Sequence, residues 1–145
     1  MRPEEQTSES DPDFFVLDVG GEGRTAGAWN LNPSPFRTFG PQRGAPIPRL
    51  IVGRGEAIPL ADATVDLLIV ERTPLRPATL RELLRVARPT GTIVLRHVET
   101  PGGDPHRVAL AFLPGEVTRG RTQIGSHSVR ETTIRLAAPR ANQRS

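Results

Sequence analysis

One group of residues has types and spacing that suit ligand binding at the edge of a sheet. The apolar run 14–17 is followed by Asp18 and then by Gly20, Gly21 and Gly23. Glycines directly after a buried strand let the backbone approach a ligand, and their amides can meet a carboxylate or phosphate. We therefore interpret this acid and these glycines as a candidate ligand-binding loop. A simple turn that closes a buried strand is the alternative.

Three further candidates follow later apolar runs. Arg54 and Glu56 stand in a Gly-Arg-Gly-Glu segment after the run 49–52, where ligand contacts beside the sheet are one interpretation and an exposed loop is the other. Arg54 would favour an anion. Glu71 follows the run 65–70 and could act as a general base. A solvated acid at the end of a strand is the alternative for Glu71.

The histidines offer one further catalytic hypothesis. His97 and Glu99 follow the run 92–95, and alternate residues of a strand face the same side, so these two could form an acid/base pair. His106 and His127 complete the set of three histidines, and none has a metal-ligand spacing. Because cysteine is also absent, we expect no metal site and no thiol chemistry.

These candidates need a sheet that brings strand ends together. Between the runs 65–70 and 92–95, the segment 77–88 has an apolar stripe at helical spacing, formed by Leu80, Leu83, Leu84 and Ala87. Pro77 suits the first turn of this helix, and Pro89 and Gly91 are expected to end it. A strand–helix–strand unit predicts parallel strands with a right-handed crossover.

The flanking segments predict the rest of one domain. A second short strand is expected at 28–32, a proline-rich loop at 33–48, a short helix from 106 to 113, and a closing hairpin from 116–124 and 128–137. We expect a single domain over residues 13–138, a disordered acidic lead-in over 1–12 and a disordered tail over 139–145.

Charge and hydropathy exclude several classes of function. All 19 basic residues are arginine, and the formal net charge is only +3. No basic patch with interleaved aromatic residues supports nucleic-acid binding. No apolar run is long enough to span a membrane, and the acidic N-terminus is unlike a signal peptide. We expect a cytoplasmic protein, or one exported as part of a larger carrier.

The segment from Gly53 to Leu95 contains a characteristic set of residues: Glu56, Pro59, Asp66, Glu82, Arg85, Val86, Pro89 and Gly91. This set resembles the pattern of class I S-adenosylmethionine-dependent methyltransferases. In that family a Gly-Asp-Ala-Glu-x-Leu-Pro-Phe turn precedes an acidic-apolar strand, and a helix ending in Glu-x-x-Arg-Val-Leu-Lys-Pro-Gly-Gly leads into the next strand. The resemblance implies an α/β, Rossmann-like methyltransferase-type sheet and S-adenosylmethionine as cofactor. The cofactor-binding positions it implies are Asp18, Gly20, Gly21, Gly23, Asn30, Asn32, Arg54 and Glu56.

The chain departs from this family in its first strand–helix–strand unit. Only six positions separate Gly23 from Trp29, too few for the usual crossover helix. We therefore expect a trimmed first unit, in which the segment near Trp29 either pairs antiparallel or lies outside the sheet. Glu22 replaces a family glycine, and Arg54 replaces the acid that would contact the adenine. Neutral Asn30 or Asn32 stands where the family has its ribose-binding acid.

Three functions remain open on the sequence. The first is methyl transfer. The segments 28–33, 40–56 and 69–77 together resemble C-terminal domains of bacterial polymorphic-toxin and Rhs-type proteins, which adds the hypothesis of a toxin-type effector. The second is a non-catalytic protein-interaction module of the same fold, serving in assembly or immunity. The third is an anion or nucleotide binder that uses Arg54 and the glycine loop.

The missing helix leads to a prediction about assembly. One face of the sheet near Phe14, Leu17 and Trp29 should be left exposed, and an exposed apolar patch marks an interface. We expect a homodimer or a complex with a protein partner. Sedimentation well above micromolar concentration tests the homodimer, and a monodisperse monomer there would contradict it.

Overall fold

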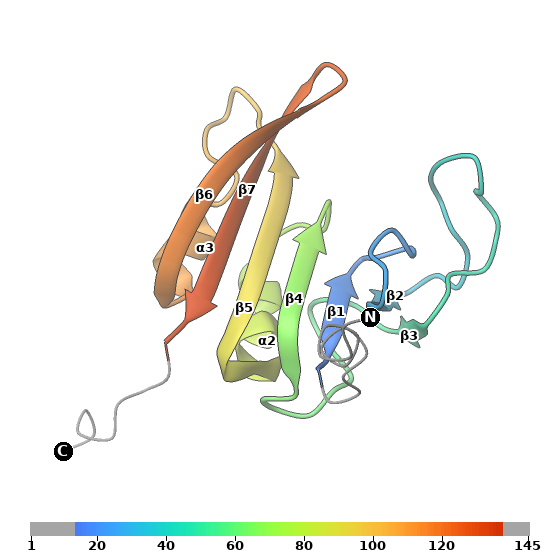
Figure 1. Cartoon of the computed structure of the whole chain (residues 1–145), viewed down its shortest axis with the longest axis horizontal. Coiled ribbons are helices and arrows are strands. Elements are labelled where there is room, and N and C mark those ends of the chain that lie inside the picture. The colour runs from blue at the N-terminus through green and yellow to red at the C-terminus, as the bar shows by residue number, and fades with distance from the viewer. Residues whose placement is uncertain (1–13, 138–145) are drawn as a thin grey trace, which may run out of the picture.

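The computed structural model describes residues 14–137, which form one seven-stranded sheet with two helices (Figure 1). The predicted lead-in (1–12) and tail (139–145) lie outside the described residues, and so do the two end residues of the predicted domain, 13 and 138. Strand order across the sheet is β3-β2-β1-β4-β5-β7-β6. The elements are β1 (Val16–Val19), β2 (Trp29–Asn32), β3 (Leu50–Val52), β4 (Val65–Glu71), α2 (Pro77–Val86), β5 (Ala87–Val98), α3 (Arg107–Phe112), β6 (Gly115–Ile124) and β7 (His127–Leu136).

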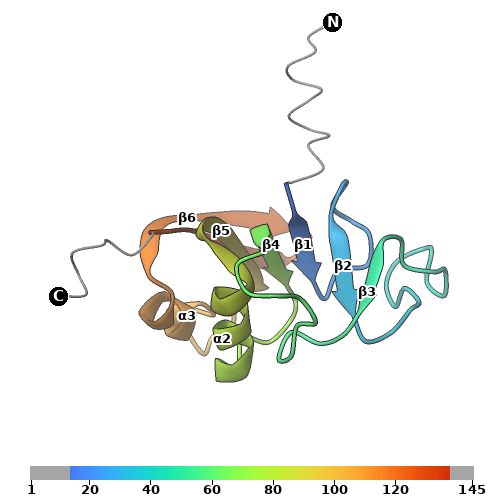
Figure 2. The same ribbon diagram turned by 90° about the horizontal axis from the view of Figure 1, so that it is seen from below.

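Both helices pack on the same face of the sheet (Figure 2). The core lies between this face and α2, where Leu80 and Leu83 of the helix meet Leu68, Val70 and other strand residues. These side chains are excluded from solvent. The predicted stripe is confirmed except for Leu84, which is 37% exposed. The helix also ends two residues earlier than expected, because β5 already begins at Ala87 and contains Pro89.

Strand β2 pairs parallel with β1 on one side and with β3 on the other, and β1 also pairs parallel with β4. The expectation that the segment near Trp29 pairs antiparallel, or leaves the sheet, is therefore wrong. The nine residues between β1 and β2 cross over without a helix. Gly20, Gly23 and Gly27 have φ values of 80°, 104° and 82°, and this left-handed backbone lets a short loop reverse direction twice.

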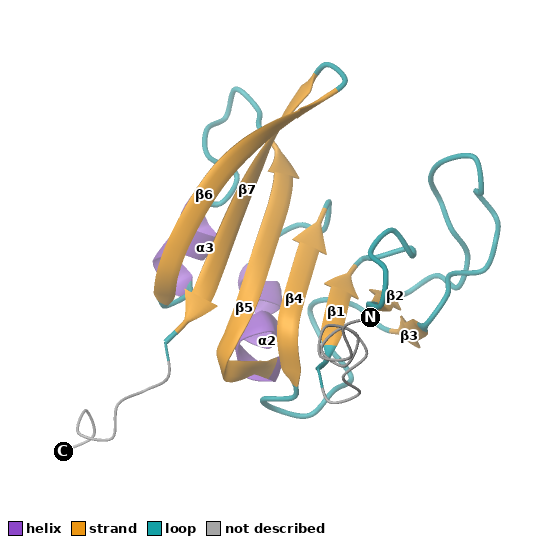
Figure 3. Ribbon diagram, viewed as in Figure 1, coloured by secondary structure: helices purple, strands orange, loops and turns teal. Residues whose placement is uncertain are grey.

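The C-terminal hairpin is confirmed, and it forms an edge of the sheet. Strands β6 and β7 pair antiparallel over ten residues, and β7 pairs antiparallel with β5. All ten residues of β6 are exposed. The proline-rich segment 33–48 is a long loop, as predicted, and it projects at the opposite end of the sheet (Figure 3).

The predicted apolar patch is only partly present. Phe14 is 53% exposed and Trp29 is 36% exposed, but Leu17 is fully buried, because it faces the helix-covered side of the sheet. Trp29 packs against a cation, with the Arg49 guanidinium 4.3 Å from its ring centroid. The expected dimer stays a prediction, and of the three residues only Phe14 and Trp29 remain exposed to form its interface.

Adjacent leucines of α2 provide a test of this packing. Leu83→Ala should lower the free energy of unfolding by about 2–5 kcal/mol, because the fully buried side chain leaves a cavity. Leu84→Ala, one position along, should cost less than about 1 kcal/mol. Urea unfolding followed by circular dichroism measures both values. Equal losses for the two variants would contradict the orientation of α2.

Candidate functional site

A small pocket lies at the carboxyl ends of β1, β2 and β3, where the resemblance places the cofactor. Its volume is about 170 Å³, and its lining includes Gly20, Leu31, Arg54 and Thr73. Pockets for small organic ligands generally enclose at least about 300 Å³. Of the predicted cofactor positions, Gly20, Arg54 and Glu56 line this pocket, and the space that it encloses is small.

Asn30 and Asn32 bind neighbouring loops instead of facing open space. Asn30 is 1% exposed; its Oδ1 accepts from the Gly23 amide at 3.1 Å, and its Nδ2 donates to the Pro48 carbonyl at 2.9 Å. Asn32 Nδ2 donates to the Gly21 carbonyl at 3.2 Å, and its Oδ1 accepts from the Ser34 amide at 3.0 Å. Both amides thus have internal partners at the positions where the family binds ribose.

The glycine turn is covered by a side chain from the loop after β4. Thr73 Oγ1 donates to the Val19 carbonyl at 3.1 Å and lies so close to Gly20 that any Cβ there would collide with it. A Cβ on Gly21 would collide with Asn30 and Asp18. Close packing of the protein against itself therefore accounts for both glycines.

Asp18 lies within β1, not in the following loop as predicted. Its carboxylate is fully buried, and burial raises its pKa, although Arg24 opposes the rise. Arg24 Nη2 lies 3.5 Å from Asp18 Oδ1, and Arg24 Nε donates to Glu71 Oε1 at 2.8 Å. Arg24 thereby joins the predicted cofactor loop to the predicted base through ion pairs with Asp18 and Glu71.

The altered family positions also have partners or are exposed. Glu22 is 9% exposed and accepts hydrogen bonds from the amide and hydroxyl of Thr38; although burial raises its pKa, these bonds hold that pKa below its usual value. Arg54 is exposed on the rim of the small pocket. Glu56 is exposed and pairs with Arg76 at 3.3 Å.

A larger pocket lies beside the ends of β4 and β5. Its volume is about 610 Å³, and its walls come from the loop after β4, from α3 and from the tip of the hairpin. The apolar lining consists of Pro74, Leu75, Val98, Pro105, Val108, Ala109, Ile124 and Val129. The predicted catalytic residues Glu71 and His97 both line it. Pro74 lines both pockets, so the loop after β4 is a shared wall.

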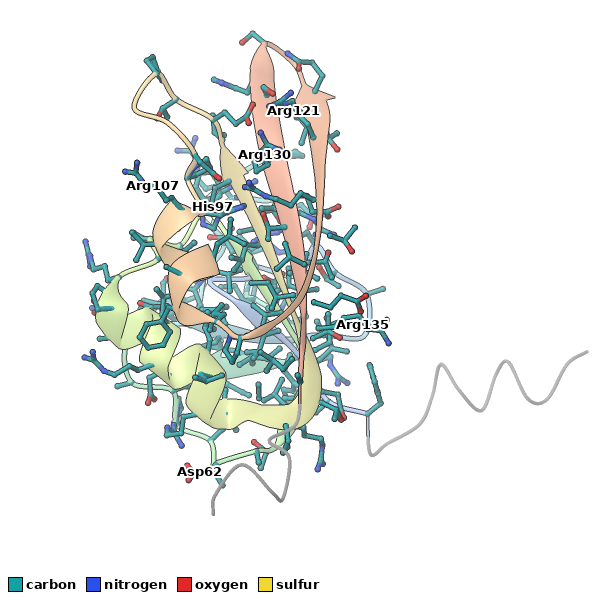
Figure 4. All side chains as sticks on the ribbon, turned by 90° about the vertical axis from the view of Figure 1, so that its left-hand side faces the viewer. Asp62, His97, Arg107, Arg121, Arg130 and Arg135 are labelled. Atoms are coloured by element: carbon teal, nitrogen blue, oxygen red, sulfur yellow. The ribbon has the colours of Figure 1, made fainter. Side chains whose placement is uncertain are left out.

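His97 lies near α3 (Figure 4) and belongs to a series of hydrogen bonds that runs through His106 to Thr132. Its Nε2 lies 2.8 Å from the Thr73 carbonyl, and its Nδ1 lies 2.9 Å from His106 Nε2. His106 Nδ1 lies 2.7 Å from Thr132 Oγ1, which accepts from Arg119 Nε at 3.1 Å. Burial lowers the pKa of His97 and lowers that of His106 to about 4, so both rings are neutral at pH 7.

The Thr73 carbonyl at the end of this series determines which atom donates in each hydrogen bond. A carbonyl oxygen can only accept, so His97 carries its proton on Nε2 and its Nδ1 must accept. His106 therefore donates from Nε2 and accepts at Nδ1 from the Thr132 hydroxyl. Every polar atom of the two rings is thereby satisfied within the protein, and neither nitrogen of His97 is free to take a proton from a bound molecule.

Glu99 does not join His97 in the predicted acid/base pair. Its carboxylate accepts from Arg121 Nε at 2.9 Å, from Ser128 Oγ at 2.8 Å and from Arg130 Nε at 3.0 Å. The Arg121 hydrogen bond holds the pKa of Glu99 below its usual value. The three partners belong to the hairpin, so Glu99 fastens the hairpin to the end of β5.

Sequence reasoning missed the contacts of Arg24, Thr73 and His106. The spacing of residues in the sequence does not predict these contacts, because each joins residues that belong to different elements of the fold. Within residues 14–137, no group of three or more acids or histidines could hold a metal ion. No helix of the described chain is long and apolar enough to cross a membrane.

Comparison with solved structures identifies the fold. A 16S rRNA (adenine(1408)-N(1))-methyltransferase from Catenulisporales acidiphilia, crystallised with the cosubstrate SAM, superposes with a TM-score of 0.59 at 17% identity, covering 97% of this chain and 93% of that one. A 1,6-didemethyltoxoflavin-N1-methyltransferase from Burkholderia thailandensis, with bound S-adenosylhomocysteine, gives 0.59 at 16%, covering 93% and 77%. A SAM-dependent methyltransferase from Aquifex aeolicus gives 0.53 at 18%, covering 94% and 90%.

The chain thus has a class I S-adenosylmethionine-dependent methyltransferase-like fold, as predicted. No protein-family model matches the sequence, and no curated protein matches it either.

The residues present do not fit the cofactor that this fold implies. The cleft holds about 170 Å³, Thr73 covers the glycine turn, and the polar atoms of Asn32 are bound internally. The larger pocket has the volume that the cleft lacks, but it lies on the other side of the loop after β4.

The lowered pKa of His106 leads to a prediction of how the free energy of unfolding depends on pH. Because folding lowers the pKa of His106 from 6.5 to about 4, the unfolded chain binds more protons between these values. The free energy of unfolding should therefore fall as the pH drops from about 6.5 to about 4. His106→Gln should flatten this fall in urea titrations, whereas His127→Gln, at the exposed hairpin tip, should leave it unchanged. An unaltered slope in His106→Gln would contradict the neutral, buried ring.

Proposed function

We propose that this chain is a non-catalytic domain of the methyltransferase fold that binds a small apolar molecule in the pocket beside β4 and β5. The observation that carries the proposal is the contrast between the two cavities. The cofactor cleft holds about 170 Å³ and is closed by the protein's own side chains, whereas the second pocket holds about 610 Å³ and is lined mainly by apolar groups. An apolar pocket of this volume with a few polar groups in its lining is a natural candidate for a ligand-binding site.

The groups that would perform chemistry in this pocket support a binding role. Glu71 Oε1 already accepts from Arg24 Nε at 2.8 Å, so this carboxylate is held in an ion pair. Both nitrogens of His97 are engaged with Thr73 and His106. A general base needs a free lone pair within reach of the proton it removes, and His97 offers none.

Methyl transfer is the second candidate. Solved neighbours of this fold were crystallised with SAM or S-adenosylhomocysteine, and the pocket beside β4 and β5 would then receive the methyl acceptor. This function requires the loop after β4 to move, so that Thr73 leaves Gly20 and the two pockets join. A toxin-type effector remains a hypothesis within this candidate, and a role in protein interaction remains one within the first.

Direct binding measurements separate the two candidates. Isothermal titration calorimetry with S-adenosylmethionine and S-adenosylhomocysteine should show no heat at millimolar ligand. The apolar fluorescent probe N-phenyl-1-naphthylamine should bind, with a rise in emission as it enters the pocket. Micromolar binding of either cofactor form would instead establish an open cleft and favour methyl transfer.

Two substitutions test whether the probe binds in the larger pocket. Val108 lines the larger pocket and is 59% exposed, so Val108→Trp should fill space there with little effect on stability. Probe affinity should fall at least about tenfold, which corresponds to about 1.4 kcal/mol. Val117→Trp, on the exposed strand β6, is the matched control and should bind the probe as the wild type does. Equal affinity of Val108→Trp and wild type would overturn the pocket assignment.

A further inference from the structure

The larger pocket has three charged residues in its lining, and each already makes a contact within the protein. Glu71 pairs with Arg24 at 2.8 Å, and Arg96 donates from Nε to Glu131 Oε2 at 2.6 Å. The Arg72 guanidinium lies 4.4 Å from the ring centroid of Phe39, in the proline-rich loop. Each ionic group is therefore directed to a partner other than a bound molecule.

The remaining polar lining residues add little for a ligand to bind. His97 is neutral, and both of its ring nitrogens have partners within the fold. His127 is exposed at the hairpin turn. The other lining residues are aliphatic side chains and prolines.

Resting on the function proposed above, we infer that the pocket selects an uncharged, mainly apolar ligand and discriminates against ions of either sign. A charged group moved from water into such a cavity loses its hydration. It gains a counter-charge only by drawing Glu71, Arg72 or Arg96 away from its present contact. Recruiting Glu71 or Arg96 would break an existing ion pair and leave the abandoned partner uncompensated. An uncharged ligand gains the burial of apolar area without these costs.

The ion pair between Arg96 and Glu131 is the feature that sets the charge preference on the β5 side. Removing the carboxylate would leave Arg96 in the pocket wall with free donors, which is the arrangement that binds an anion. Glu131 is on β7 and does not line the pocket itself, so its change alters the charge of the wall without altering the walls' shape.

Two fluorescent probes with a common ring system test this inference. N-phenyl-1-naphthylamine is uncharged, and 8-anilinonaphthalene-1-sulfonate adds one sulfonate. The wild type should bind the uncharged probe at least about tenfold more tightly. In Glu131→Gln the affinity for the sulfonate should rise about fivefold to tenfold, while that for the uncharged probe should stay the same.

The control is Glu116→Gln, which removes the partner of Arg135 on the same hairpin, where both side chains are more than 70% exposed and neither lines the pocket. It should change neither affinity. Equal binding of both probes by the wild type, or an unchanged sulfonate affinity in folded Glu131→Gln, would overturn the inference. If the uncharged probe fails to bind the wild type, the proposed function fails as well, so the two failures are distinguishable.

Discussion

The amide of Asn30 holds together the part of the sheet that lacks a crossover helix. Through one oxygen and one nitrogen it binds the glycine loop at Gly23 and the proline-rich loop at Pro48, while its backbone lies in the middle of β2. A helix between β1 and β2 would normally fill this space and fix the strand spacing. Here a buried side chain, hydrogen-bonded at both ends, performs that task, and an unsatisfied amide at the same place would be costly.

Other side chains around the candidate cofactor site also bind partners within the protein. Glu22 ties the glycine loop to Thr38, Thr73 closes over Gly20, and Arg24 joins Asp18 to Glu71. Positions that could hold a cofactor thus stabilise a small domain with few helices. The protein retains the architecture of the methyltransferase fold, while its open volume lies on the far side of the loop after β4.

Periodic segments of the sequence predicted their structure well, and isolated polar residues did not. The stripe that includes Leu80 and Leu83, and the alternation in the hairpin, report burial directly, so the strand–helix–strand unit and β6–β7 are confirmed. The parallel pairing of β2 was predicted wrongly, because chain length alone cannot reveal a glycine loop that reverses twice. The candidate site residues stay a prediction, and the sequence contains no signal for the internal partners that several of them have in the structure.

The contact between Trp29 and Arg49 has a practical consequence. Trp29 is the single tryptophan of a chain that contains no tyrosine, so the near-ultraviolet emission of the protein comes essentially from one indole ring. That ring sits on β2 under a guanidinium that precedes β3, at the junction of the helix-free strands with the proline-rich loop. The molecule therefore carries a natural fluorescent reporter beside its helix-free strands and the proline-rich loop, and this region can be followed without any added label.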